Sequence, residues 1–220
     1  MKDSLKRNGL TLTAFALVTT GLIALTHQFT DDKIKSQQQQ QLQKLLGSIV
    51  PANLHDNDIE HDCTEVSHPE FLGNSDAKKV YRARLAGEPA ALVIQTITPD
   101  GYSGNIELLV GIDAQGKVTG VRAIKHQETP GLGDKIDVRI SDWILSFNGK
   151  GLGNGDEKNW AVKKDGGQFD QFTGATITPR AVVGAVRDAL KLSNSMQQQL
   201  YDAPNLCKVS KVSTKEEAHE

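Results

Sequence analysis

The chain has 220 residues, a formal net charge of −2 and only 5% aromatic residues. This balance gives no basic patch of the kind that binds nucleic acid, and so few aromatic residues argue against a surface on which bases stack. The length suits one soluble domain with accessory segments.

An uncharged, mostly apolar run from Gly9 to Thr26 predicts a membrane-spanning helix. With its flanks, this run approaches the roughly 20 residues that a helix needs to cross a bilayer. Lys2, Lys6 and Arg7 precede the run, and basic residues of this kind stay on the cytoplasmic side. A cleaved signal peptide is the alternative, but no small-x-small cleavage site follows the run, which favours an uncleaved anchor.

The segment that follows the apolar run predicts a helix and then a polar connection. A glutamine-rich run at 37–41 leads into apolar residues at helical spacing, and Pro51 is expected to end this helix. Four potential metal ligands stand near or beyond that end, at His55, His61, Cys63 and His68. Their spacing fits no standard zinc pattern, so no metal site is expected.

The chain has two cysteines, Cys63 and Cys207. A compartment outside the cytoplasm would permit a disulfide between them. Because the closed loop would be long, the entropy model assigns the bond about 4–5 kcal/mol. The sequence does not show that the two residues meet, so a disulfide and two free thiols both stay open.

Residues 78–125 predict antiparallel strands joined by short turns, with alternating side chains at 80–85 and a more apolar run at 90–97. Strands are expected at 80–85, 90–97, 106–112 and 118–124. Turn residues stand at 87–89, 99–101 and 113–116.

The segment from His126 to Asp134 contains the loop sequence Glu-Thr-Pro-Gly-Leu-Gly. Thr129 precedes a proline, which favours extended backbone, and Gly131 and Gly133 permit a positive φ and close approach of the backbone to a flat ring. The segment can also serve as a plain connection with Asp134 as an N-cap. The two interpretations are compatible, because apolar residues at helical spacing follow at Ile136, Ile140, Trp143, Ile144 and Phe147.

The stretch from Asp170 to Thr176 reads Asp-Gln-Phe-Thr-Gly-Ala-Thr and leads into another predicted helix. Thr178 suits an N-cap and Pro179 a first helical position, and apolar residues recur at helical spacing toward Tyr201. The N-terminus of a helix favours a phosphate, and the Thr176 hydroxyl would lie within its reach. A glycine turn that merely feeds the helix is the alternative interpretation.

These two motifs resemble those of the FMN-binding domain family. Asp-x-x-Thr-Gly-Ala-Thr resembles the acceptor pattern in which the last threonine takes FMN through a phosphoester bond, and Glu-Thr-Pro-Gly-Leu-Gly resembles the loop that faces the flavin. The whole chain is similar to the G subunits of Rnf/Rsx-type electron-transport complexes, and more distantly to the C subunits of sodium-translocating NADH:quinone reductases.

The resemblance implies roles for individual residues. Thr176 would carry one covalent FMN, attached by a separate flavin transferase that recognises Asp170. Close backbone approach to the phosphate is implied for Thr173, Gly174 and Ala175. The residues implied to line the flavin ring are Glu128, Thr129, Leu132 and Gly133.

The resemblance also implies an electron carrier in a complex that couples electron transfer between ferredoxin and NAD to ion movement, or that reduces an iron–sulfur regulator. The chain has no cysteine set for an iron–sulfur cluster and no nicotinamide fingerprint. One spanning helix cannot form an ion channel, so other membrane and peripheral subunits are expected partners and the chain alone is not a complete enzyme. A membrane-anchored flavin sensor and a cofactor-free periplasmic binding module are the alternatives.

We therefore expect an α+β protein of the bacterial inner membrane, in which a single N-terminal transmembrane helix precedes a periplasmic FMN-binding domain with an antiparallel sheet flanked by helices. The expected parts are a cytoplasmic N-terminus at 1–8, the transmembrane helix at 9–29, a membrane-proximal helix and connection at 30–76, the FMN-binding domain at 77–203 and a flexible C-terminal tail at 204–220.

Overall fold

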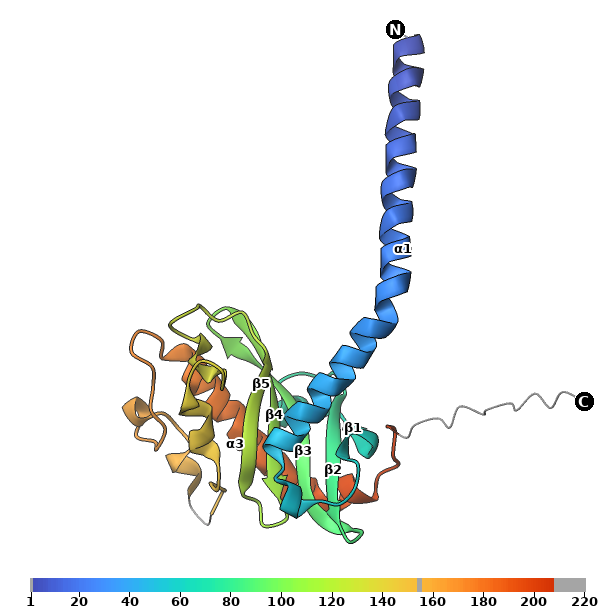
Figure 1. Cartoon of the computed structure of the whole chain (residues 1–220). Helices are drawn as coiled ribbons and strands as arrows, with labels where there is room; N and C mark the ends of the chain where they lie inside the picture. The colour runs from blue at the N-terminus through green and yellow to red at the C-terminus, as the bar shows by residue number, and fades with distance from the viewer. Residues whose placement is uncertain (1, 154–155, 208–220) are drawn as a thin grey trace, which may run out of the picture. The chain divides into compact units, whose positions relative to one another are not determined.

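The computed structural model describes residues 2–153 and 156–207 (Figure 1). The chain divides into two compact units, Met1–Lys44 and Leu45–Glu220. Because the two units are not placed relative to each other, each is described by itself.

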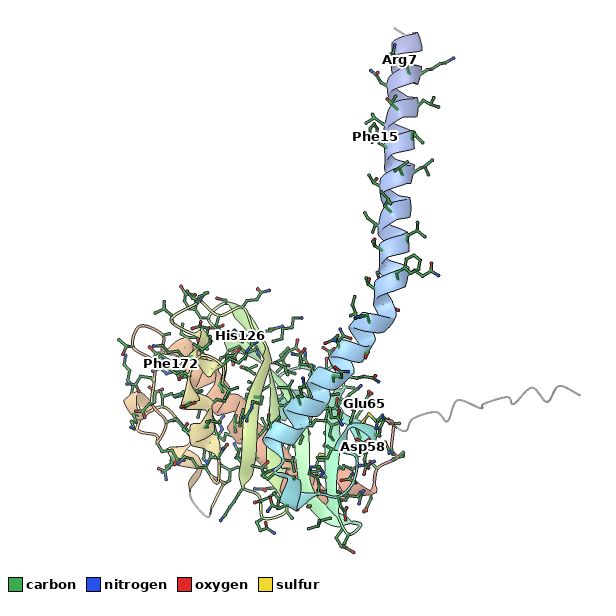
Figure 2. The ribbon with its side chains drawn as sticks, in the orientation of Figure 1. Arg7, Phe15, Asp58, Glu65, His126 and Phe172 are labelled. Carbon is green, nitrogen blue, oxygen red and sulfur yellow. A yellow bond between two sulfur atoms is a disulfide. The ribbon has the colours of Figure 1, made fainter. Side chains whose placement is uncertain are left out.

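The first unit is helical and belongs to α1 (Lys2–Ile49). Within it, Lys6–Asp31 is long and apolar enough to cross a membrane, and none of it is buried. Arg7 and Phe15 project outward from the helix (Figure 2). Five threonine hydroxyls in this stretch donate to carbonyls one turn earlier, as Thr26 does to the oxygen of Leu22 at 2.6 Å, so these five donors are paired within the helix. The predicted N-terminal apolar helix is confirmed.

The second unit is built on one antiparallel sheet of five strands in the order β1-β2-β3-β4-β5. Each strand pairs with its neighbours in the sequence; short turns connect the strands from β2 to β5, whereas the connection from β1 to β2 is longer and contains a short helix. The strands are β1 (Cys63–Val66), β2 (Lys78–Leu85), β3 (Glu88–Gly101), β4 (Gly104–Asp113) and β5 (Val118–Lys125). The predicted α+β class with an antiparallel sheet is confirmed.

The last long helix of the unit covers one face of this sheet (Figure 1), and the final residues of α1, at 45–49, contact the other face. On one face, α3 (Ile177–Asp202) buries Val182 and Val186 in a core shared with Ile94 of β3. Each such side chain contributes about 1.5–3 kcal/mol when it leaves water. On the other face, the buried Ile49 at the end of α1 lies over Gly111, where an added Cβ would stand 2.3 Å from its side chain. Ile49 can therefore lie this close to the sheet only because Gly111 has no side chain.

Two strand boundaries differ from the expected ones. The turn between β2 and β3 is formed by Ala86 and Gly87, both with positive φ, so Pro89 already lies in the strand. β3 also continues through Pro99 to Gly101, so the expected turn at 99–101 is wrong. The pairing register shifts between Thr98 and Gly101, and such an irregularity accommodates a proline that cannot donate to the ladder.

The expected polar connection contains two unpredicted elements, β1 and the short helix α2 (Pro69–Leu72). β1 is an edge strand of four residues, too short to show alternation. A disulfide joins its first residue, Cys63, to Cys207, with the two Cα atoms 5.2 Å apart. The Leu206 N–H also donates to the Cys63 oxygen at 2.8 Å. Residues 204–207 of the predicted tail are thus fixed to the sheet edge, whereas residues 208–220 lie outside the described residues.

The single helix expected from the apolar spacing at 136–147 is also wrong. The structure has two short 3₁₀ segments, Asp134–Ile136 and Asp142–Phe147, separated by a turn, and the residue that caps the first is Gly133 rather than Asp134. Asp137 explains the interruption, because its carboxylate accepts from the backbone N–H of Arg139 at 2.9 Å. Aspartate competes with helical bonding in this way.

Candidate functional site

A cavity of about 330 Å³ lies where three segments of the second unit meet. The turn between β3 and β4 contributes Tyr102, and the loop after β5 and the beginning of α3 contribute the rest. The lining consists of Tyr102, Glu128, Thr129, Leu132, Gly133, Gly174, Ala175, Thr176, Ile177 and Thr178. The fold thus brings together the two sequence motifs, which are separated by about 40 residues in the sequence.

Thr176 is the N-cap residue of α3 and is half-buried at the cavity. Its side chain makes no capping hydrogen bond, and its hydroxyl has no partner among the described residues. The helix begins at Ile177, so the expected N-cap role of Thr178 is wrong and Pro179 occupies the third position instead of the first. Proline is tolerated there because the N–H groups of a first turn have no intrahelical partner.

A tight turn precedes Thr176. The Ala175 N–H donates to the Phe172 oxygen at 3.2 Å, and Gly174 between them has a φ of +84°, a conformation that favours glycine. Phe172 anchors the turn in the core, because it is buried and packs edge-on against Trp143 with ring centroids 5.0 Å apart. Thr173 and Gly174 remain exposed at the tip of the turn.

Asp170, the first residue of the acceptor motif, does not line the cavity. Its side chain is 69% exposed, and one carboxylate oxygen lies 2.6 Å from the Lys163 ammonium. Its backbone oxygen accepts from the Trp143 indole at 2.7 Å. The backbone at this position is thus fixed while the carboxylate stays accessible to another protein.

The loop 126–134 differs in one respect from expectation. Gly131 has the expected positive φ of +77°, but the φ of Gly133 is −84°. Gly133 is needed for space instead, because a Cβ there would stand 2.8 Å from a carboxylate oxygen of Glu128. The Thr129 oxygen accepts from the N–H groups of Leu132 and Gly133, each at 3.1 Å, which closes the loop tightly.

Glu128 is 4% exposed and forms the polar floor of the cavity. Its carboxylate accepts from the Ser103 N–H at 3.0 Å and from the hydroxyl of Thr178, which is fully buried. The sequence does not predict this role of Thr178. No local pattern could have revealed it, because the partner lies 50 residues earlier in the sequence.

Charged groups near the beginning of α3 are paired with each other. The guanidinium of Arg180 binds both carboxylate oxygens of Asp165 at 2.6 Å. Hydrogen bonds from Arg180 lower the pKa of Asp165, and the same pairing raises the pKa of Arg180. Lys163, a possible partner of a phosphate, is already paired with Asp170.

The structure does not assemble the four potential metal ligands of the polar connection into one site. Cys63 is in the disulfide, His68 stacks on Phe71 and His61 bonds to Asp58. Asp58, Glu60 and His61 place ligand atoms within 4.8 Å of one another, but exposed acidic groups commonly do so without an ion. Asp58 and Glu65 of this region are labelled in Figure 2.

Comparisons with known proteins agree with this geometry. Residues 101–191 match the FMN-binding domain family, and residues 1–49 match the RnfG N-terminal region family. The first match contains every residue that lines the cavity. It also contains the acceptor turn and the loop 126–134.

Several relatives are about half identical over nearly their whole length, and each carries the name of the G subunit of an ion-translocating oxidoreductase complex. The relative from Pseudoalteromonas atlantica is 51% identical over 94% of this chain and 97% of its own length. The relative from Shewanella baltica is 50% identical over 96% of this chain and 99% of its own length. The relative from Vibrio cholerae is 51% identical over 94% of this chain and 99% of its own length. The chain therefore belongs to the family of G subunits of ion-translocating oxidoreductase complexes and contains an FMN-binding domain.

Proposed function

We propose that this chain carries one FMN, joined through its phosphate to the Thr176 hydroxyl, and relays electrons as a subunit of an ion-translocating oxidoreductase complex. The observation that supports this most strongly is the Thr176 side chain. It stands at the N-terminus of a 26-residue helix, at the edge of a cavity, with a hydroxyl that no other described group uses.

The chemistry of the cavity fits such a group. The first turn of α3 favours a phosphate, and the exposed backbone at Gly174 lets one approach closely. Leu132 and Ile177 are 41% and 47% exposed, and Tyr102 is 69% exposed. Apolar side chains left open around a cavity are suited to cover a flat ring. The roles of Thr173, Ala175, Thr129 and the other residues implied by the resemblance stay predictions.

A bound FMN supplies the electron transfer itself, while the protein determines its orientation and surroundings. The helix N-terminus and the loop 126–134 would hold the two ends of the cofactor. A covalent tether prevents loss of a small cofactor from a domain outside the cytoplasm. Thr176 is in this account an attachment point and takes no part in turnover.

We place the second unit in the periplasm, anchored to the inner membrane by the span within Lys6–Asp31. The basic residues that precede the span favour a cytoplasmic N-terminus. The Cys63–Cys207 disulfide supports the same side, because such bonds persist in oxidising compartments. In cells whose outer membrane has been permeabilised, a protease that cannot cross the inner membrane should degrade this unit. Protection from the protease would contradict the topology. The division of the chain into segments at 1–8, 9–29, 30–76, 77–203 and 204–220 also belongs to this proposal.

The expected partners are the other subunits of the complex and a flavin transferase. The relatives are named as one subunit of a complex, and a single span cannot move ions alone. The accessible carboxylate of Asp170, just before the acceptor turn, is the group that we assign to recognition by the transferase.

The test is flavin fluorescence in denaturing gels of membranes that also contain the transferase. We expect a fluorescent band for the native chain and for Thr176→Ser, which keeps a hydroxyl, and no band for Thr176→Ala. Equal fluorescence in Thr176→Ala would show that the flavin is attached elsewhere.

A further inference from the structure

A buried carboxylate, that of Glu128, connects three segments at the cavity that Thr176 also lines. Glu128 is only 4% exposed, yet it has no cationic partner among the described residues. Instead it accepts from the backbone of Ser103, in the turn after β3, and from the hydroxyl of Thr178, in the first turn of α3. A buried carboxylate is stable only when such donors satisfy it.

Two glycines from different segments make the space for this carboxylate. A Cβ at Gly101 would stand 2.9 Å from one oxygen of Glu128, and a Cβ at Gly133 would stand 2.8 Å from the other oxygen. The Cβ at Gly133 would also lie 2.8 Å from the Thr178 hydroxyl. The last glycine of Glu-Thr-Pro-Gly-Leu-Gly therefore accommodates the glutamate that begins the same loop.

This cluster fixes the backbone that carries Thr176. Thr178 lies two residues beyond Thr176, within the same helical turn. Because the Thr176 side chain has no hydrogen bond of its own among the described residues, its position depends on the backbone around it. Among the side chains of that first turn, Thr178 is fully buried and bonded, whereas Ile177 is 47% exposed.

We propose that Glu128 is a positioning residue for flavin attachment, acting through Thr178 to hold the Thr176 hydroxyl in the geometry that the transferase requires. The inference rests on the proposed function. Attachment forms a bond from the Thr176 oxygen to the flavin phosphorus. It breaks the phosphoanhydride bond of an activated donor such as FAD, whose nucleotide portion leaves as AMP, and the hydroxyl proton passes to solvent or to the transferase. Glu128 serves only to orient the acceptor.

The experiment measures the rate of FMN attachment to the full-length protein in detergent, with purified transferase and FAD, by intact mass. In Glu128→Ala we expect the rate to fall on the order of tenfold or more, because displacement of a reacting group by about 1 Å has effects of that size. Glu128→Gln should restore most of the rate, because an amide can accept from Ser103 and donate to the Thr178 oxygen. Thr178→Val should resemble Glu128→Ala, and Thr178→Ser should resemble the native chain.

A general loss of stability is separated from positioning by a matched control. Val110→Ala makes a cavity in the sheet core, away from the site, and should lower the melting temperature without slowing attachment. The double variant Glu128→Ala/Thr178→Val should be no slower than the slower single variant if the two side chains act as one unit.

The outcomes distinguish this inference from the proposed function. If the native chain takes up no flavin, the proposed function is wrong. If the native chain is flavinylated and Glu128→Ala is flavinylated at the same rate, only the positioning role is wrong. A slowdown in Val110→Ala equal to that in Glu128→Ala, at matched melting temperature, would likewise overturn it.

Discussion

The two ends of α3 differ in how side chains bind their backbone groups. At its C-terminal end, the guanidinium of Arg82, 2% exposed, donates to the backbone oxygens of Leu200, Tyr201 and Ala203 at 2.6–3.2 Å. Asp62 in turn binds Arg82 at 2.6 Å. The last carbonyls of the helix are thus satisfied by a charge of the favourable sign.

At the N-terminal end, no side chain caps the helix and the Thr176 hydroxyl is open to a cavity. The buried Glu128 holds this end in place through Thr178 without covering it. The comparison shows that side chains satisfy the last carbonyls of α3, whereas no side chain caps its N-terminal end beside the candidate cavity. Changes at the two ends should therefore have separable effects.

The largest effect on stability is expected at the closed end. Arg82→Met would leave the Leu200 and Ala203 oxygens without this donor, whereas Asp62 and the Tyr201 oxygen keep Arg84 as a partner. Each buried acceptor left unsatisfied costs about 1–3 kcal/mol of unfolding free energy. Lys125→Met is the control, because that side chain is 74% exposed and its ammonium lies 3.7 Å from the half-buried Glu107 carboxylate. An exposed pair contributes under about 1 kcal/mol. Urea unfolding measures both, and equal losses would contradict the account of the closed end.

Removal of the disulfide should have the next largest effect. Cys207→Ser frees the segment that is fixed to β1 and should lower the unfolding free energy by about 2–4 kcal/mol. Reductant should have the same effect on the native chain and none on the variant. Since the bond lies at the edge strand β1 and not at the cavity, flavin attachment under native conditions should be unchanged. Loss of flavin attachment in Cys207→Ser would contradict this prediction, because it would show that the disulfide affects the cavity.

A smaller effect distinguishes two glycines that have nearly identical φ angles, Gly174 and Gly87. Gly174→Ala and Gly87→Ala both place a side chain at positive φ, +84° and +83°, which costs about 1 kcal/mol. Only at Gly174 would the new Cβ also meet a neighbour, at 3.3 Å from Leu132 in the cavity. Thermal melts should show similar shifts for both variants, but flavin attachment should slow only in Gly174→Ala. Equal attachment rates would contradict the account of the acceptor turn.

The smallest effect at neutral pH concerns Tyr201. Burial raises the pKa of this phenol from 10.0 to about 12. A raised pKa in the folded state means that the protonated form is favoured by folding. Its contribution is therefore complete below pH 10 and is lost as the pH rises through about 12. Tyrosinate absorbance in an alkaline titration of the native chain should show groups that ionise late, since burial also raises the pKa of Tyr81, and Tyr201→Phe should remove one of these late steps. An unchanged titration curve would contradict the buried phenol.

The sequence predicts the parts of this molecule that depend on local patterns. The strand at 80–85 alternates, the strand at 90–97 is a more apolar run, and the apolar run after Gly9 is unmistakable. The two motifs were also found, because glycines and threonines at fixed spacing carry the family resemblance. In each case the information lies within one run of consecutive residues.

What the sequence does not predict depends on contacts between distant segments. β1 is four residues long, and its pairing with β2 and its bonds to Asn205 and Leu206 emerge only in the folded chain. Apolar spacing predicted a helix at 136–147, but the side chain of Asp137 interrupts it. The pairing of Glu128 with Thr178 has no sequence signal, although it shapes the candidate site.

The central claim is that the open end of α3 carries flavin on one hydroxyl. Peptide mass spectrometry of the native chain, purified from membranes that contain the transferase, tests this most directly. The account predicts that the peptide containing Thr176 gains the mass of FMN less one water, with fragment ions that place the addition on Thr176 rather than on Thr173 or Thr178. An unmodified Thr176 in flavin-loaded protein would contradict it.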